Sequence, residues 1–212
     1  MRTLRSASAT QPATVRLPVL RPIVALVAAL LVCTMVSPVA SPMASAAPAY
    51  TGEVEDYAGY EPQTKCAKKV KPGTAYLLRW LVEEYPNTRA GSTLRSCSGS
   101  SVSEHKDGRA LDWGANASNR PQRRAVKRFL ARIFATDVEG NTHALARRMG
   151  IMYLIWNDRM YASYRQFEKR DYLSSGCRTQ ANCSQTLRHR DHVHISLSRR
   201  GAAGLTSFYP SA

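Results

Sequence analysis

The stretch from 103 to 112, S-E-H-K-D-G-R-A-L-D, decides how the fold and the function of this chain are read. It places His105 and Asp112 seven residues apart, with Gly108 and Ala110 between them. Glycine allows a tight turn or a close backbone approach, and the apolar run 110–113 (A-L-D-W) favours a strand that carries the carboxylate. Imidazole and carboxylate are natural ligands of a borderline divalent ion such as zinc. The stretch therefore predicts part of a metal site.

A second cluster lies near the end of the chain, where residues 189–196 read H-R-D-H-V-H-I-S. The alternation over 192–197 is typical of a strand, in which successive side chains point to opposite faces. His192, His194 and Ser196 should then share one face, and the apolar residues between them should enter the core. A catalytic zinc site uses three protein ligands and keeps one position open. His105, Asp112 and one histidine of this cluster would meet that requirement.

The first 46 residues have the features of a secretory signal peptide. Four arginines precede an apolar run from Ile23 to Val36, and Ala44-Ser45-Ala46 forms a small-x-small cleavage site. The run covers about 14 residues, fewer than the roughly 20 of a bilayer span. We expect an exported chain of about 166 residues, enough for one domain with a core. Residues 47–64 are expected to form an extended, acidic lead-in, and residues 65–212 the domain.

The chain is strongly basic. Removing the four leader arginines from its formal charge of +15 leaves +11. Such a charge favours anionic partners, either acidic cell-wall polymers such as teichoic acid or nucleic acid. It is equally compatible with solubility and weak non-specific attraction. The same two interpretations apply to the cations of the helix expected after Asn119, which are Arg120, Arg123, Arg124, Lys127, Arg128 and Arg132.

Four cysteines remain after removal of the leader, and an even number in an exported chain indicates two disulfides. Three pairings are possible. Cys177–Cys183 is favoured because it closes a short loop, which leaves Cys66–Cys97. Zinc ligation by these cysteines is disfavoured because the chain has no C-x-x-C pair.

Hydrophobic periodicity and turn residues predict the remaining elements. We expect a helix capped by Thr74 and ended by Pro86, a short strand at 93–97, and a helix with Pro121 in its first turn. A short helix over 143–149, with His143 as a surface residue, precedes a buried strand at 151–156, a turn at Asn157-Asp158 and a strand partner at 159–163. Few helices and several short strands indicate an α+β fold, a small antiparallel sheet flanked by helices with the site on its open face.

The two clusters together resemble the zinc D-Ala-D-Ala carboxypeptidases. The matching positions are Ser103-x-His105-x-x-Gly108-x-Ala110-x-Asp112, followed by His192-x-His194. More broadly the chain is similar to the superfamily that joins those enzymes with lysostaphin-type endopeptidases and the Hedgehog signalling domain. The resemblance covers about 20 residues and implies a Hedgehog/D,D-peptidase-like zinc fold. It also implies one Zn²⁺ per chain held by His105, Asp112 and His194.

The resemblance also implies roles near the metal. Many relatives have a glutamate as general base three residues before the last histidine ligand, where this chain has the shorter Asp191. His192 matches a histidine that stabilises the tetrahedral intermediate, and His189 matches a further histidine of some carboxypeptidases. Ser103 would support a ligand or the turn. Arg95 could bind a substrate carboxylate, although such an arginine is more often simply solvated.

These features predict an exported zinc metallopeptidase that hydrolyses amide bonds in peptidoglycan stem peptides, as a D,D-carboxypeptidase or endopeptidase. We expect a secreted or wall-associated monomer whose partners are peptidoglycan peptides and anionic wall polymers, without specific nucleic-acid binding. Two alternatives remain open. One is a non-catalytic zinc-containing wall-binding or ligand-binding domain, which the Asp191 departure keeps open, and the other is a metal-dependent nuclease.

Overall fold

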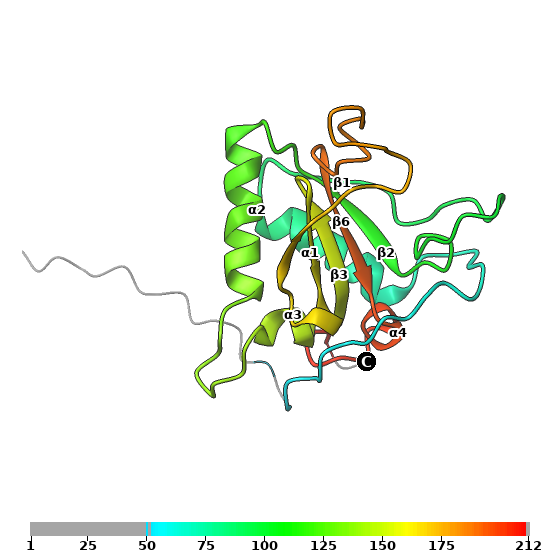
Figure 1. Ribbon diagram of the computed structural model, residues 1–212. Helices are drawn as coiled ribbons and strands as arrows, with labels where there is room; N and C mark the ends of the chain where they lie inside the picture. The colour runs from blue at the N-terminus through cyan, green and yellow to red at the C-terminus, as the bar shows by residue number, and fades with distance from the viewer. Residues whose placement is uncertain (1–49, 51, 211–212) are drawn as a thin grey trace, which may run out of the picture. The chain divides into compact units, whose positions relative to one another are not determined.

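The computed structural model describes residue 50 and residues 52–210. The predicted signal peptide and its cleavage site lie outside the described residues. Within them, a six-stranded antiparallel sheet is combined with four α-helices and one short 3-10 helix, η1 (Ser163–Arg165). This confirms the expected mixed helix-and-sheet architecture, a small antiparallel sheet flanked by helices (Figure 1). None of the helices in the described residues combines the length and the apolar character of a membrane span.

The strand order places the second sequence cluster in the middle of the sheet. The order is β1-β2-β6-β3-β4-β5, and every neighbouring pair is antiparallel. The last strand in sequence, β6 (His192–Leu197), therefore lies between β2 (Ala110–Gly114) and β3 (Ile151–Trp156). The outer strands are β1 (Arg89–Ala90), β4 (Arg159–Ala162) and β5 (Lys169–Asp171).

Alternation along the central strands separates a core face from a site face. Leu111, Trp113, Val193, Ile195 and Leu197 are fully buried in the hydrophobic core. Asp112, His194 and Ser196 are the intervening residues and share the other face, as the period of two requires. The predicted alternation over 192–197 is confirmed.

The first helix begins earlier than predicted. α1 spans Pro72–Glu84, with Pro72 in its first turn and Lys71 at the N-cap position. The prediction that Thr74 caps the helix is wrong, because Pro72 starts the helix two residues earlier: its fixed φ suits the first helical position, and the N–H that it lacks would have no intrahelical partner there. Thr74 lies inside the helix, fully buried, and its hydroxyl donates 3.0 Å to the carbonyl oxygen of Gly108. The helix is thus hydrogen-bonded to Gly108, the glycine of the stretch 103–112.

The second helix, α2 (Arg120–Ile133), begins where the sequence predicts. The Asn119 side chain accepts a hydrogen bond from the backbone N–H of Gln122, which satisfies one free donor of the first turn. Its buried positions are Ala125, Val126, Phe129 and Ile133, and its cations lie mainly on the exposed side. Figure 1 shows α2 beside the sheet and α1 behind the sheet.

Two short strands differ from the prediction. The strand expected at 93–97 does not form, and the strand that pairs with β2 is β1, Arg89–Ala90. Beyond it the chain still follows β2, since the Asp112 N–H donates to the Ser92 carbonyl oxygen at 2.8 Å. β5 was not expected, because its three residues are all charged and exposed and carry no apolar pattern.

The two short helices in the C-terminal half of the chain are each followed by a glycine with positive φ. α3 spans Ala144–Arg148 and is followed by Gly150 with φ +66°, which agrees with the predicted helix end. α4 (Arg199–Ala203) is capped by the Ser198 hydroxyl and ends at Gly204 with φ +76°. Both predicted disulfides are present, Cys66–Cys97 and Cys177–Cys183.

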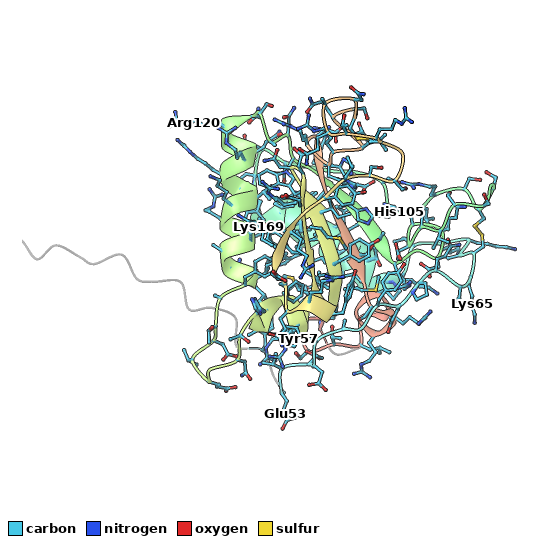
Figure 2. All side chains as sticks on the ribbon, viewed as in Figure 1. Glu53, Tyr57, Lys65, His105, Arg120 and Lys169 are labelled. Carbon is cyan, nitrogen blue, oxygen red and sulfur yellow. A yellow bond between two sulfur atoms is a disulfide. The ribbon has the colours of Figure 1, made fainter. Side chains whose placement is uncertain are left out.

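The described part of the acidic lead-in packs against the domain. Both carboxylate oxygens of Glu55 accept hydrogen bonds from Ser207, and Glu61 accepts from the Arg199 N–H at 2.6 Å. Further on, the Gln63 side chain accepts from the Ser103 N–H at 2.9 Å. Figure 2 labels Tyr57 in the lead-in and Lys65 just after it. The lead-in is therefore hydrogen-bonded to the stretch 103–112 through Gln63 and Ser103.

Candidate metal centre

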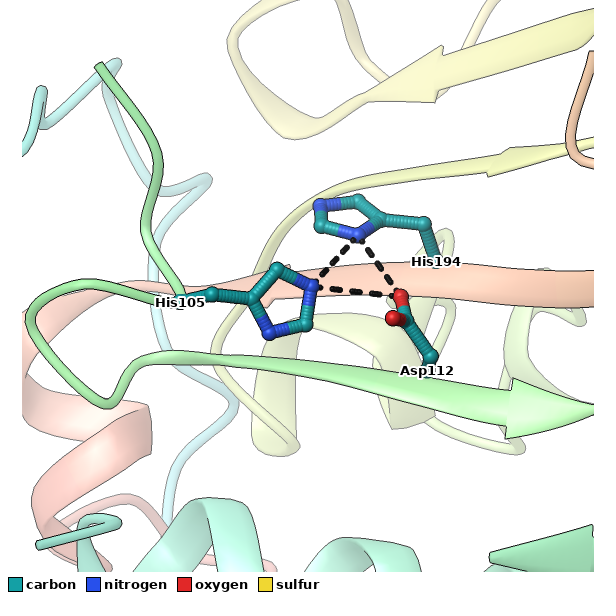
Figure 3. Close-up of side chains that lie close together, drawn as sticks. All are labelled: His105, Asp112 and His194. Atoms are coloured by element: carbon teal, nitrogen blue, oxygen red, sulfur yellow. Dashed lines mark hydrogen bonds and ion pairs between the residues drawn. The ribbon is translucent and has the colours of Figure 1, made fainter. Parts of the chain in front are cut away.

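Three side chains from the two sequence clusters converge on one point. Nε2 of His105 lies 3.2 Å from Oδ1 of Asp112 and 3.2 Å from Nδ1 of His194, and Nδ1 of His194 lies 3.1 Å from Oδ1 of Asp112. Figure 3 shows the three atoms directed toward one another. The group has the composition and spacing to hold a metal ion.

The spacing of these atoms fits a tetrahedral ion. Ligand atoms at zinc bond lengths of about 2.0 Å and tetrahedral angles lie about 3.3 Å apart. The three observed separations of 3.1–3.2 Å are close to this value. Two imidazoles and one carboxylate are also a donor set that zinc accepts, and three protein ligands leave a fourth position open. The residues present therefore have the donor set and the spacing for a divalent metal ion, and zinc is one ion that accepts them.

Local sequence and sheet register together bring the ligands into contact. Asp112 and His194 are direct partners across β2 and β6, so their side chains project from the same face. His105 reaches them from the turn that precedes β2. That turn closes at Gly108, whose N–H donates to the His105 carbonyl oxygen and whose φ of +73° favours glycine. The glycine of the sequence motif is thus required by the backbone geometry.

Lys106 holds the same turn from the other side, a role that sequence reasoning missed. It is only 3% exposed, and its Nζ donates to the carbonyl oxygens of Ser98, Gly99 and Ser101 at 2.6–3.2 Å. The neighbouring Cys66–Cys97 disulfide ties this loop to the segment that follows the lead-in. A buried ammonium needs such partners because an unpaired one costs several kcal/mol. The turn that carries His105 is therefore held by the Gly108 backbone on one side and by the Lys106 hydrogen bonds on the other.

The environment keeps Asp112 ionised and His194 neutral. Burial alone would raise the pKa of the Asp112 carboxyl, but its interactions with His105 and His194 lower it well below its usual range. Burial lowers the pKa of His194, against the opposing effect of the Asp112 hydrogen bond. A carboxylate and a neutral imidazole are the protonation states that metal ligation requires.

A histidine–aspartate pair lies beside the three ligand atoms. Nδ1 of His192 is 2.7 Å from Oδ1 of Asp191, and the other Asp191 oxygen accepts from the Thr186 hydroxyl at 2.6 Å. On the opposite side of the ring, Nε2 of His192 lies 3.5 Å from Oδ1 of Asp112. The His192 ring therefore stands between the two carboxylates, with Asp191 orienting it and Nε2 facing the metal group. Both Asp191 oxygens are engaged in these contacts.

His189 also faces this region. Its ring centroid lies 4.8 Å from that of His192 and 5.6 Å from that of His194. Burial, with the adjacent His194 and His192, lowers its pKa to about 3. His189 has φ +50°, and its carbonyl oxygen accepts a 2.7 Å hydrogen bond from the Asn157 N–H in the β3–β4 turn. The predicted turn at 157–158 therefore also positions His189.

A charged pair reinforces that contact. The Arg188 guanidinium donates two hydrogen bonds of 2.8 Å to the Asp158 carboxylate. Hydrogen bonding from Arg188 lowers the pKa of Asp158. Two parallel N–H···O bonds fix orientation as well as distance. The pair links the β3–β4 turn to the loop that leads into His189.

None of the three remaining residues singled out from the sequence belongs to the ligand group, and only Ser103 and Arg95 contact the turn that carries His105. Ser103 is buried, and its backbone holds the turn by accepting from the Lys106 N–H at 2.9 Å. Arg95 is exposed, and its N–H donates to the His105 carbonyl oxygen at 3.3 Å. His143 precedes α3, where its Nδ1 lies 2.9 Å from the Tyr57 hydroxyl, outside the metal group.

Sequence reasoning missed Glu104 and Tyr153 as members of the site. The Tyr153 ring stacks on that of His194, with centroids 5.7 Å apart, and its hydroxyl donates to Glu104 Oε2 at 2.6 Å. Burial and the Glu104 carboxylate raise the pKa of Tyr153. Tyr153 belongs to an apolar strand run, so its pattern indicated only a core residue. A glutamate next to His105 was the one local signal of a buried charge.

Comparison with known families adds one assignment. The family model described as VldE, C-terminal domain matches residues 66–183, more than half of the chain. The chain belongs to this family. The match spans His105, Asp112 and all four disulfide cysteines, and it ends before β6, which carries His192 and His194. No curated protein and no solved structure matches the chain.

Proposed function

We propose that this chain is an exported zinc metallopeptidase that hydrolyses amide bonds in peptidoglycan stem peptides, as a D,D-carboxypeptidase or endopeptidase. One observation carries the proposal. Three candidate ligand atoms lie 3.1–3.2 Å from one another, beside the His192 imidazole, whose Nδ1 is bonded to the Asp191 carboxylate. This combines a Lewis-acid site with a proton carrier, as amide hydrolysis requires. The resemblance to the zinc D,D-carboxypeptidases, with their superfamily fold, supports the substrate class.

Each group has a proposed task. A zinc ion at His105, Asp112 and His194 would polarise the scissile carbonyl and activate water at neutral pH. His192 exchanges a proton through Nε2, because Asp191 binds Nδ1 and fixes the ring orientation. Asp191 is therefore proposed to orient His192 instead of acting directly as the base. His189, neutral at pH 7, lines the same region as an uncharged hydrogen-bonding group.

The exposed cations of α2 are the proposed contact with anionic wall polymers. Arg120, Arg124, Lys127 and Arg128 are exposed along one helix that contains no acidic residue. Figure 2 shows Arg120 at one end of this helix. Their spacing of three or four residues places the charges about one helical turn apart, suited to a linear polyanion. Two disulfides favour an oxidising, extracellular environment for such a partner.

Metal content and peptide hydrolysis test the proposal. The purified protein should contain one zinc per chain, and His105→Ala and His194→Ala should lose it. Muropeptides incubated with the zinc-loaded protein should release D-alanine or split cross-links, as read by mass spectrometry. His192→Ala should keep the zinc and lose hydrolysis at least about 100-fold, within the usual range for a proton-transfer group. His143→Gln, a histidine outside the metal group, is the matched control.

The same experiment separates the alternatives. Full zinc occupancy without hydrolysis of any muropeptide would refute the peptidase and support a non-catalytic zinc-containing binding domain. Absence of bound zinc, in protein never exposed to chelators, would refute both. Cleavage of added DNA with magnesium would support the nuclease.

A further inference from the structure

A buried row of hydrogen-bonding groups runs from the metal group into the protein. Nε2 of His194, the nitrogen that faces away from the other ligands, lies 2.9 Å from the Ser196 hydroxyl. The Tyr153 hydroxyl donates to Glu104 Oε2 at 2.6 Å, and Tyr153 lies directly across the strand pair from Ser196, whose hydroxyl is within its interaction range. Ser196 is fully buried, Glu104 is 4% exposed and His194 is 8% exposed. Water has little access to these groups, so they satisfy one another.

Sheet register explains why the row exists. Tyr153 on β3 is the direct cross-strand partner of Ser196 on β6, and His194 precedes Ser196 by two residues on the same face. The Tyr153 ring can therefore stack on His194 while its hydroxyl passes Ser196. Glu104 reaches the tyrosine from the turn that carries His105. The Glu104 carboxylate is thus next to His105 in sequence and reaches the surroundings of His194 through Tyr153.

The donors and acceptors in the row can point in one direction. A histidine that binds a metal through Nδ1 carries its proton on Nε2, so His194 must donate to Ser196. Each hydroxyl then accepts one hydrogen bond and donates one, and the Glu104 carboxylate, which only accepts when ionised, ends the row. The order is His194 N–H to Ser196 O–H to Tyr153 O–H to Glu104. No donor in this order is left without an acceptor.

We propose that Ser196, Tyr153 and Glu104 are positioning residues that hold His194 in the Nε2–H tautomer and so present its Nδ1 lone pair to the metal. Groups bound to the second nitrogen of a ligating histidine fix its tautomer and orientation, and their loss typically weakens metal affinity 10–100-fold. The inference rests on the metal site of the proposed function. It concerns metal affinity and can be tested without any substrate.

The test is zinc affinity of the full chain, measured by competition with a chromophoric chelator. Ser196→Ala leaves the buried Nε2–H without its acceptor and should weaken binding about 10–100-fold. Tyr153→Phe interrupts the row one step further away and should cost about tenfold. Glu104→Gln keeps an acceptor for the tyrosine and should cost less than either. Tyr161→Phe, at a half-buried tyrosine of β4 outside the row, is the matched control and should bind as the wild type does.

Two further readouts exclude a merely structural effect. In the zinc-loaded wild type, the imidazole ¹⁵N spectrum should show His194 protonated at Nε2, and Ser196→Ala should shift or broaden that N–H signal. Thermal unfolding of the metal-free forms shows whether weaker binding follows from a less stable fold. Unchanged zinc affinity in both Ser196→Ala and Tyr153→Phe would overturn the inference while leaving the proposed function intact. A wild type that binds no zinc would overturn both.

Discussion

Replacing Gly108 by alanine tests whether the turn that carries His105 is held by backbone geometry. Gly108 has φ +73°, and a Cβ built on it would lie 2.8 Å from the Lys69 carbonyl oxygen and 3.3 Å from the Lys71 nitrogen. The Lys71 N–H also donates to the Gly108 carbonyl oxygen at 3.1 Å, so the two segments are already bonded together. The segment 69–71 can therefore not move away without losing that contact.

The expected cost has two parts. The left-handed conformation costs a residue with a Cβ roughly 1–2 kcal/mol, and forcing an extra carbon against packed backbone costs about 1–3 kcal/mol more. A total of about 3 kcal/mol in the free energy of unfolding corresponds to a fall in Tm of about 6–12 °C for a domain of this size. Because the turn carries a ligand, zinc affinity should fall as well.

Two other glycines separate the conformational cost from the steric cost. Gly140 has φ +87° with no atom within 4 Å of a Cβ, so Gly140→Ala should show the conformational cost alone, about 1–2 kcal/mol. Gly59 has open space and no positive φ, so Gly59→Ala should change stability by less than about 0.5 kcal/mol. Urea unfolding of the metal-free proteins measures all three. If Gly108→Ala costs no more than Gly140→Ala, the predicted contact with Lys69 is refuted.

Three other perturbations have defined outcomes. Chelation should lower the Tm of the zinc-loaded wild type, since an ion at 100 times its Kd adds about 2.7 kcal/mol, and should not affect alanine variants of either histidine ligand; equal shifts would contradict the site. Opening Cys66–Cys97, which spans 31 residues, should destabilise by about 3–4 kcal/mol, against about 2 kcal/mol for Cys177–Cys183, which spans 6, and calorimetry showing the reverse order would refute this. Because Arg188 holds the pKa of Asp158 below its usual value, the stability advantage of wild type over Asp158→Asn should be complete above about pH 4 and vanish as the pH falls through the lowered pKa. A gap that is the same at pH 2 and pH 7 would show that ionisation of Asp158 contributes nothing.

Features that depend on local pattern could be predicted from the amino-acid sequence. The alternation over 192–197 predicted a strand with its histidines on one face, and the short spacing of Cys177 and Cys183 predicted both disulfides. The Asn119 cap and apolar period of α2 also needed no distant partner. Residue chemistry indicated His105, Asp112 and one histidine of the cluster 189–194 as candidate ligands, and the resemblance to the zinc D,D-carboxypeptidases implied His194; these three residues have ligand atoms 3.1–3.2 Å apart.

Contacts between segments that are distant in sequence could not be predicted, because they form only when the domain is packed. The Glu104–Tyr153 hydrogen bond joins residues 49 positions apart, and no local pattern marks a tyrosine in an apolar strand as a donor to a buried carboxylate. The β1 strand of two exposed residues exists because it pairs with β2, and its own sequence carries no strand signal. Local patterns determine which face a side chain occupies, whereas sheet register and turn docking decide which groups then meet, because these depend on the packing of the whole domain.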